Sequence, residues 1–226
     1  MILTRSFVRP ATSRDHHQIA HLMYFESHVH RHLDWRSPLD WLGNSSYWVL
    51  EDNGQVLAAL ACPQDPPRVA WIRLFVHAAR LPLREAWETL WAIARADLAD
   101  TPDVTVASIA LKRWFQGVLR ESGFVPSCDV VTLERRWQPH RQVSPPAGYV
   151  LREMRLDDLP RVAEVDRAAF SPLWRNSLTA LQRAYRQAAF ATVLEHRGEV
   201  VGYQISTQNA LGAHLARLAV RPDVQG

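Results

Sequence analysis

The stretch Leu50-Glu-Asp-Asn-Gly-Gln-Val-Leu-Ala58 returns 144 residues later as Leu194-Glu-His-Arg-Gly-Glu-Val-Val-Gly202, with four of its nine positions identical. In both stretches a glycine separates two short apolar runs, at the place where a tight β-hairpin needs a positive φ. The segment Arg73-Leu-Phe-Val76 also returns, as Arg217-Leu-Ala-Val220, at the same spacing of 144 residues. The sequence therefore predicts two β-hairpins, each followed by a matching third strand.

The two parts of the chain also begin alike. Arg9 and Arg152, which are 143 residues apart, each end a short predicted strand, and an apolar pattern of helical period follows each strand. After each hairpin comes the third predicted strand, at residues 69–76 in the first part and Ala213–Val220 in the second. Because three segments recur in one order at nearly one spacing, we interpret the chain as two similar units in tandem. The alternative is that two unrelated hairpins resemble each other.

Only the first part continues beyond its third strand. The sequence predicts a long amphipathic helix over 83–98, a β-branched strand at Val104–Leu111, a second helix over 114–119 with Gly123 as its C-terminal cap, and final strands within Phe124–Trp137.

These patterns predict three segments. We expect a complete first domain at 1–137, a polar, proline-bearing linker at 138–148, and the N-terminal part of a second domain at 149–226. The second domain would stop inside a loop, so we expect the chain to be a fragment of a longer protein.

The stretch Leu218-Ala-Val-Arg-Pro-Asp-Val-Gln-Gly226 resembles the acetyl-CoA motif of the GNAT (Gcn5-related) N-acetyltransferase superfamily. In that motif a strand ends in apolar-x-Val and leads, through a proline turn, to Gln/Arg-x-x-Gly-x-Gly/Ala. Gln225 stands at the Gln/Arg position and Gly226 at the first x. The stretch Trp114–Phe124 resembles the family's penultimate helix and its Gly-Phe strand entry. The resemblance implies an α/β fold with a mixed sheet, of the GNAT-like acyl-CoA N-acyltransferase type.

The resemblance also implies a function: transfer of an acetyl group from acetyl-CoA to an amine by direct attack in the second domain. Leu218, Ala219, Val220, Gln225 and Gly226 would hold the co-substrate. Backbone N–H groups at a helix N-terminus suit a pyrophosphate, and a free strand edge can pair with the pantetheine arm as with another strand. The amide of Ala219 or Val220 would then polarise the thioester carbonyl. The acceptor, a small molecule or peptide, must present a neutral amine, so a base or a water chain is also needed.

The first domain departs from this motif. At a spacing of 144 residues, Leu81 and Pro82 take the places of Gln225 and Gly226, and Arg84 falls on a glycine position. We therefore expect a degenerate, structural first domain, with Arg84 as a surface arginine or, alternatively, a phosphate contact. Its helix at 114–119 also lacks the family's tyrosine acid.

Other polar residues have weaker patterns. His214, on the strand of the co-substrate motif, is a weak candidate for the catalytic base, against a plain hydrogen-bonded histidine. The cluster His28-Val-His-Arg-His32 is interpreted as a solvated loop, an acceptor-site lining or, least favoured, a metal site; we expect no metal. Glu51 and Glu195, at equivalent positions before the hairpin turns, favour a turn role over a catalytic one.

Composition limits the class of protein. The chain has 226 residues, 47% of them hydrophobic, which suffices for two small cores. Net charge is +3 and the basic residues, all arginine except Lys112, are scattered, so nucleic acid is not an expected partner. Cys62 and Cys128 do not make a disulfide framework, and Cys62 is predicted to be buried. With no signal or membrane segment recognised, a cytoplasmic location is expected.

Two expectations follow for this chain by itself. Leu215, Leu218 and Val220 would lie on an exposed edge strand, through which the second domain could form a homo-oligomer. We expect weak or absent binding of acetyl-CoA. The alternative function is a non-catalytic pseudo-acetyltransferase that acts as a binding module.

Overall fold

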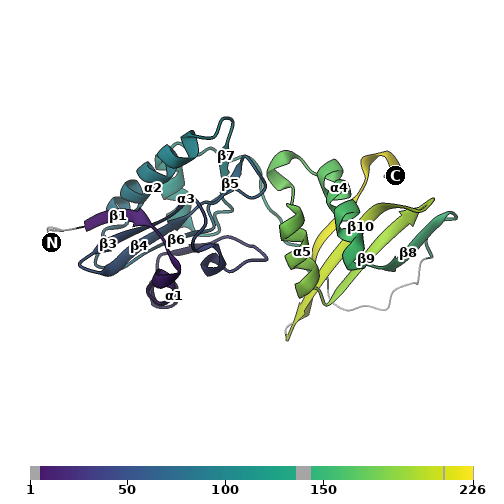
Figure 1. The fold of residues 1–226 in the computed structure, drawn as a ribbon, viewed down its shortest axis with the longest axis horizontal. Coiled ribbons are helices and arrows are strands. Elements are labelled where there is room, and N and C mark those ends of the chain that lie inside the picture. The colour runs from purple at the N-terminus through teal and green to yellow at the C-terminus, as the bar shows by residue number, and fades with distance from the viewer. Residues whose placement is uncertain (1–5, 136–143, 211, 226) are drawn as a thin grey trace. The chain divides into compact units, whose positions relative to one another are not determined.

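The computed structural model describes residues 6–135, 144–210 and 212–225. The chain divides into two compact units, unit 1 at Met1–Val130 and unit 2 at Val131–Gly226 (Figure 1). Most of the predicted linker, from 138 to 143, lies outside the described residues. In the described part of the chain, no helix is both long and apolar enough to span a bilayer.

Unit 1 is built on a five-stranded antiparallel sheet with the order β1-β3-β4-β6-β2. Its strands are β1 (Ser6–Pro10), β2 (Val29–Arg31), β3 (Tyr47–Asp52), β4 (Gln55–Ala61) and β6 (Leu74–His77). A separate parallel pair joins β5 (Val69–Trp71) to β7 (Thr105–Ala107).

Helices cover both faces of this sheet (Figure 1). Helix α1 (His16–Phe25) buries Ile19, Leu22 and Met23 in the cluster on one face. Helices α2 (Leu83–Ala99) and α3 (Arg113–Glu121) fill the other face with Trp87, Leu90 and Phe115. The helical spacing of apolar residues thus predicted these helices correctly, and Gly123, with φ +86°, follows the end of α3 as expected.

Two strand-bearing segments of unit 1 were predicted wrongly. Residues 69–76 form two strands, because β5 pairs with β7 while β6 pairs with β4, and the chain turns between the two sheets. Residues 124–135 contain no strand, and Val125, Val131 and Leu133 there are more than 70% exposed. Apolar side chains alone do not make a strand without a neighbouring edge to pair with. Residues 136 and 137 lie outside the described residues.

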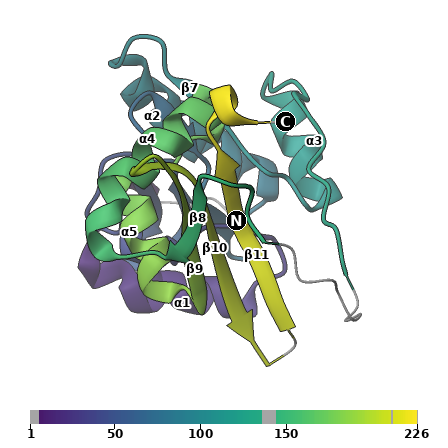
Figure 2. The same ribbon diagram turned by 90° about the vertical axis from the view of Figure 1, so that its right-hand side faces the viewer.

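Unit 2 has a four-stranded antiparallel sheet with the order β11-β10-β9-β8 (Figure 2). Its strands are β8 (Tyr149–Glu153), β9 (Phe190–His196), β10 (Glu199–Asn209) and β11 (Gly212–Val220). Helices α4 (Leu159–Ala169) and α5 (Leu178–Gln187) pack against one face through buried Val162, Val165 and Leu181. The predicted strand at Ala213–Val220 is confirmed as β11.

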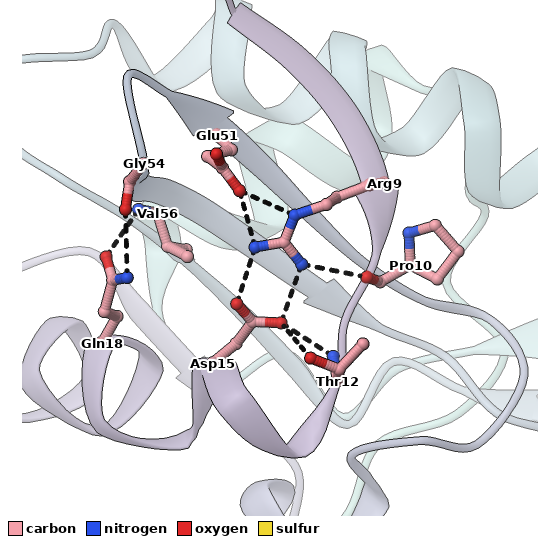
Figure 3. Close-up of polar contacts among 8 residues, drawn as sticks. All are labelled: Arg9, Pro10, Thr12, Asp15, Gln18, Glu51, Gly54 and Val56. Atoms are coloured by element: carbon pink, nitrogen blue, oxygen red, sulfur yellow. Dashed lines mark hydrogen bonds and ion pairs between the residues drawn. The ribbon is translucent and has the colours of Figure 1, made fainter.

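The same ion cluster occurs in both units. In unit 1, the Arg9 guanidinium donates to Asp15 at 2.7 and 2.8 Å and to Glu51 at 2.7 Å (Figure 3). In unit 2, Arg152 makes the equivalent contacts with Asp158 and Glu195, at 2.6 to 2.8 Å. The arginine holds the pKa of each aspartate below its usual range.

These clusters explain part of the sequence repeat. Each one ties the first strand to the start of the first helix and to the strand before the hairpin turn. Glu51 and Glu195 are therefore cross-strand partners of an arginine, a role that the turn interpretation missed.

The positive φ predicted for the glycines of the two hairpin turns is confirmed. Asn53 and Gly54 have φ values of +50° and +79°, and Arg197 and Gly198 have +53° and +81°. Both are two-residue turns with positive φ at both positions, which matches the twist of the flanking strands.

The register of the third strand corrects the repeat by one residue. Ala58 pairs with His77, and Gly202, which is 144 residues after Ala58, pairs with Val220. The third strands therefore correspond at a spacing of 143 residues, so that Val220 matches His77 and not Val76. A one-residue slip turns every side chain to the other face of a sheet, so the correspondence of Arg217 with Arg73 was wrong.

Candidate functional site

The outer edge of β11 is the main candidate site. In the described residues β11 pairs with β10 alone and ends the sheet. The prediction of an exposed edge strand is confirmed for Leu215 and Leu218, which are 55% and 56% exposed, while Val220 is partly buried.

The hydrogen-bond pattern decides which backbone groups this edge presents. The N–H of Arg221 donates to the carbonyl of Val201 at 2.8 Å, towards β10. Successive residues of a strand direct their backbone groups to opposite sides. The amide of Ala219 therefore points towards β10, and the amides of Leu218 and Val220 point to the open edge.

A short turn follows this edge directly. Residues Pro222–Val224 form a 3-10 helix, and Arg221 pairs there with Asp223 at 2.7 Å. The side-chain amide of Gln225 donates to the outward carbonyl of Val220 at 2.7 Å. Gln225 therefore lies beside Val220, whereas Gly226 lies outside the described residues.

A buried ionic network lies behind the edge, on the covered face. The Asp166 side chain is fully buried on α4 and accepts hydrogen bonds from the Tyr203 hydroxyl at 2.5 Å and from Arg217 at 2.6 and 2.8 Å. Asp166 also accepts the N–H of Asn176 at 2.7 Å, and Arg217 stacks on the ring of Phe170. Burial and the Asp166 charge raise the pKa of Tyr203. The network fixes β11 and β10 to α4 and to the segment after it.

Sequence reasoning missed this network. Asp166 falls on the apolar face of the α4 pattern. A carboxylate at such a position is a sequence signal for a buried ion pair, because a buried carboxylate must be paired.

His214, the candidate base, lies at the other end of β11. It is exposed and pairs with Thr207, six residues from Val220. An extended strand rises about 3.3 Å per residue, so the two positions are about 20 Å apart. The strand therefore does not bring His214 to the outward amides.

In the described part of unit 1 the corresponding strand, β6, has no open edge, because β2 pairs with it. Val29, His30 and Arg31 pair with Val76, Phe75 and Leu74 of β6. His30 is buried, and its Nε2 lies 2.9 Å from the carbonyl of Ile72, to which it donates. The interpretation of His28–His32 as a solvated loop was wrong. No group of three or more potential metal ligands is found among the described residues.

His30 and His32, in and just after this strand, predict that unit 1 is sensitive to acid. Burial lowers the pKa of His30 to about 4, and burial together with the charge of Arg73 lowers that of His32 to about 3. Both are therefore neutral in the folded unit and protonate in the unfolded chain below pH ~6.5. The free energy of unfolding should fall from pH 6.5 towards pH 4, by about 1.4 kcal/mol per pH unit for each histidine at most.

Chemical denaturation of unit 1 at pH 7, 5.5 and 4.5 measures this loss. In the double variant His30→Gln with His32→Gln, the free energy of unfolding should depend less on pH. An unchanged slope in that variant would assign the acid sensitivity to other groups.

Other predicted residues of unit 1 have structural environments. Arg84 is an exposed arginine paired with Glu121 at 2.8 Å, as the surface alternative predicted. The corrected register also removes it from the glycine position assigned by the 144-residue spacing. Cys62 is buried as expected, and burial raises its pKa to about 12.

Comparison with solved structures identifies the fold. The chain is similar to a GCN5-related N-acetyltransferase from Kribbella flavida, with a TM-score of 0.62 and 12% identity over 98% of this chain and 59% of that one. It is also similar to a GCN5-related N-acetyltransferase from Sphaerobacter thermophilus, with a TM-score of 0.60 and 15% identity over 100% of this chain and 79% of the other. A tandem GNAT protein from the clavulanic acid biosynthesis pathway matches with a TM-score of 0.55 and 17% identity, over 98% of this chain and 81% of the other.

These similarities show the GNAT fold over almost the whole chain. They confirm the predicted fold class. No family model and no curated protein matches the sequence.

Proposed function

We propose, from the GNAT fold of this chain, that it is an acyl-CoA-dependent N-acyltransferase whose co-substrate lies along the open edge of β11. Acetyl-CoA is the proposed donor and an amine of a small molecule or peptide the acceptor. Unit 2 is the proposed site of the reaction, and unit 1 is structural.

One observation carries the proposal: the amides of Leu218 and Val220 point outward from an edge that meets no other strand in the described residues. This edge leads directly into the turn Arg221–Gln225. An extended arm with its own amide groups, such as pantetheine, can pair with such an edge as an added strand. The neighbouring turn would receive the diphosphate, with Gln225 and Gly226 as the proposed contacts.

The same geometry supports a chemical role for the edge. When a neutral amine attacks a thioester carbonyl, a C–N bond forms and the carbonyl oxygen becomes negative. The C–S bond then breaks, the sulfur leaves as thiolate, and the proton lost by the amine nitrogen converts it to the free thiol. An outward N–H fixed in a sheet can donate to that oxygen without reorganising. Val220, nearest the turn, is the proposed donor, and the inward amide of Ala219 is not. The described residues leave the base unassigned.

Release of the CoA thiol tests the activity. The whole chain is mixed with acetyl-CoA and a panel of primary amines, and both the free CoA thiol and the mass gain of the amine are measured. The proposal expects amine-dependent release above the rate of hydrolysis without amine. The open edge of β11 and its turn lead us to propose binding of acetyl-CoA, in place of the weak or absent binding expected from the sequence. Binding of acetyl-CoA with no transfer to any amine would favour the binding-module alternative, and no interaction with acetyl-CoA at all would reject the proposal.

A further inference from the structure

We propose that the segment Glu26–His32 is a built-in occupant of the ligand edge of unit 1, so that each chain takes a single acyl-CoA, in unit 2. This inference rests on the proposed function, because it treats the open edge of β11 as the place of the acyl-CoA arm. Its basis is a difference between two corresponding sheets: among the residues that the structure describes, β11 has one neighbouring strand, whereas β6 lies between β4 and β2.

The register shows that β2 meets the residues that correspond to the open edge. His77 matches Val220 in the corrected register, and Phe75 therefore matches Leu218. The N–H of His32 donates to the carbonyl of Arg73 at 3.0 Å. By alternation along antiparallel strands, His30 and Phe75 then exchange both of their backbone hydrogen bonds. The backbone of His30 occupies in unit 1 the place that stays open beside Leu218.

Side chains anchor this internal strand. The His30 ring is 4% exposed and stacks on Phe115 with ring centroids 4.1 Å apart. The Arg31 guanidinium donates to the carbonyl of Met23 at 2.5 Å, and the His28 ring stacks on His77. Removing β2 from the edge would expose a core histidine and break these contacts, so the strand is a fixed part of unit 1.

The same segment also supplies an anion to the turn after β6. The Glu26 carboxylate accepts the N–H of Ala79 at 3.0 Å. The backbone N–H groups on either side are also hydrogen-bonded within unit 1. That of Ala78 donates to the carbonyl of Leu57 at 2.7 Å, and that of Leu81 donates to the carbonyl of Ala78 at 2.9 Å. An arriving diphosphate would meet a negative charge here. The seven residues from Glu26 to His32 thus provide both a strand and a carboxylate of the chain's own.

Residue-resolved hydrogen exchange of the whole chain without ligand tests the occupied edge. The Phe75 amide is expected to exchange about 100-fold more slowly than the Leu218 amide, because the Phe75 N–H faces β2 whereas the Leu218 N–H faces away from β10 and, in the described residues, meets no strand. Equal exchange rates for the two amides would overturn the proposal.

Titration with acetyl-CoA, followed by the amide resonances, tests the single site. Resonances of Leu218 and Val220 should shift while those of Phe75 and His77 stay in place at saturation. A shift of Phe75 and His77 with the same affinity would overturn the proposal. If no resonance of β11 responded, the proposed function would fail, and the ligand-free exchange of Phe75 would still decide whether β2 occupies its edge.

The variant His30→Ala removes the anchor of β2 and keeps its backbone. We expect the Phe75 amide to exchange at least 10-fold faster, while Val49 in the centre of the sheet stays protected and so reports that unit 1 is folded. His17→Ala, on the exposed face of α1, is the matched control and should change neither amide. Unchanged protection of Phe75 in His30→Ala would contradict the anchoring role.

Discussion

The variant Leu218→Pro is expected to weaken acetyl-CoA binding by about 10- to 100-fold while unit 2 stays folded. Proline removes one backbone N–H, and at this position that N–H faces the open edge and makes no bond to β10. Proline is tolerated on edge strands when its missing N–H faces solvent. Its ring also fills the space beside the strand, so an added strand cannot approach.

Matched variants separate this loss from the loss of a side chain. Leu218→Ala keeps the amide and should bind acetyl-CoA within about threefold of the parent chain. Ala219→Pro removes an inward N–H and should instead damage the pairing of β11 with β10. Equal binding by the Leu218→Pro and Leu218→Ala variants would show that the outward amide is not used. Affinities are measured by resonance shifts of the Arg221 amide, which remains in all three variants.

The second large effect is expected for Asp166→Ala, which should lower the free energy of unfolding of unit 2 by about 3–5 kcal/mol. The change leaves the Arg217 guanidinium, 14% exposed, without its counter-charge. It also leaves the Tyr203 hydroxyl and the Asn176 amide without an acceptor. An uncompensated buried charge is among the most costly single defects in a protein core.

Exchange of the β10 amides under urea reports on unit 2 separately from unit 1. Glu164→Gln, on the exposed side of the same helix, removes an ion pair with Arg161 and should leave the free energy of unfolding nearly unchanged, because water screens exposed ion pairs. Asp166→Asn should fall between the two. A loss below about 1 kcal/mol for Asp166→Ala would show that the network does not hold β11 in place.

Periodic segments of the chain were predictable from sequence, and the reason is physical. The apolar stripe of α2 and the two glycine turns depend on neighbours within a few residues, so local pattern determines them. The strand at Ala213–Val220 was predictable for the same reason. Residues 124–135 also looked β-like, but a strand needs an edge to pair with, and local pattern does not show whether one is present.

The register of the third strand could not be obtained from residue identity. Arg73 and Arg217 are each followed by Leu and, two residues later, by Val, yet the sheet matches Arg217 with Leu74. The two hairpins correspond at 144 residues, each with a register shift, at Leu50/Glu51 and at Val200/Gly202, whereas the third strands that pair with them correspond at 143. Sequence identity between two short stretches therefore located the third strand correctly. It assigned the side chains of that strand to the wrong faces of the sheet.

The site was predictable in part. Leu218, Val220 and Gln225 form the edge and its turn, because the motif is contiguous in the chain. The occupant of the unit 1 edge was not predictable, since His30 and Phe75 are 45 residues apart and three alternating residues are too few to signal a strand. Asp166 and Arg217 are 51 residues apart, and only the fold brings them together.

The claim on which this account depends is that the edge of β11 accepts an extended arm of acyl-CoA. It is tested most directly by the exchange rates of three consecutive amides, with and without saturating acetyl-CoA. The account predicts that Leu218 and Val220 slow by at least 10-fold on binding, while Ala219, already bonded to β10, does not change. Binding that leaves Leu218 and Val220 exchanging at their free rates would contradict it.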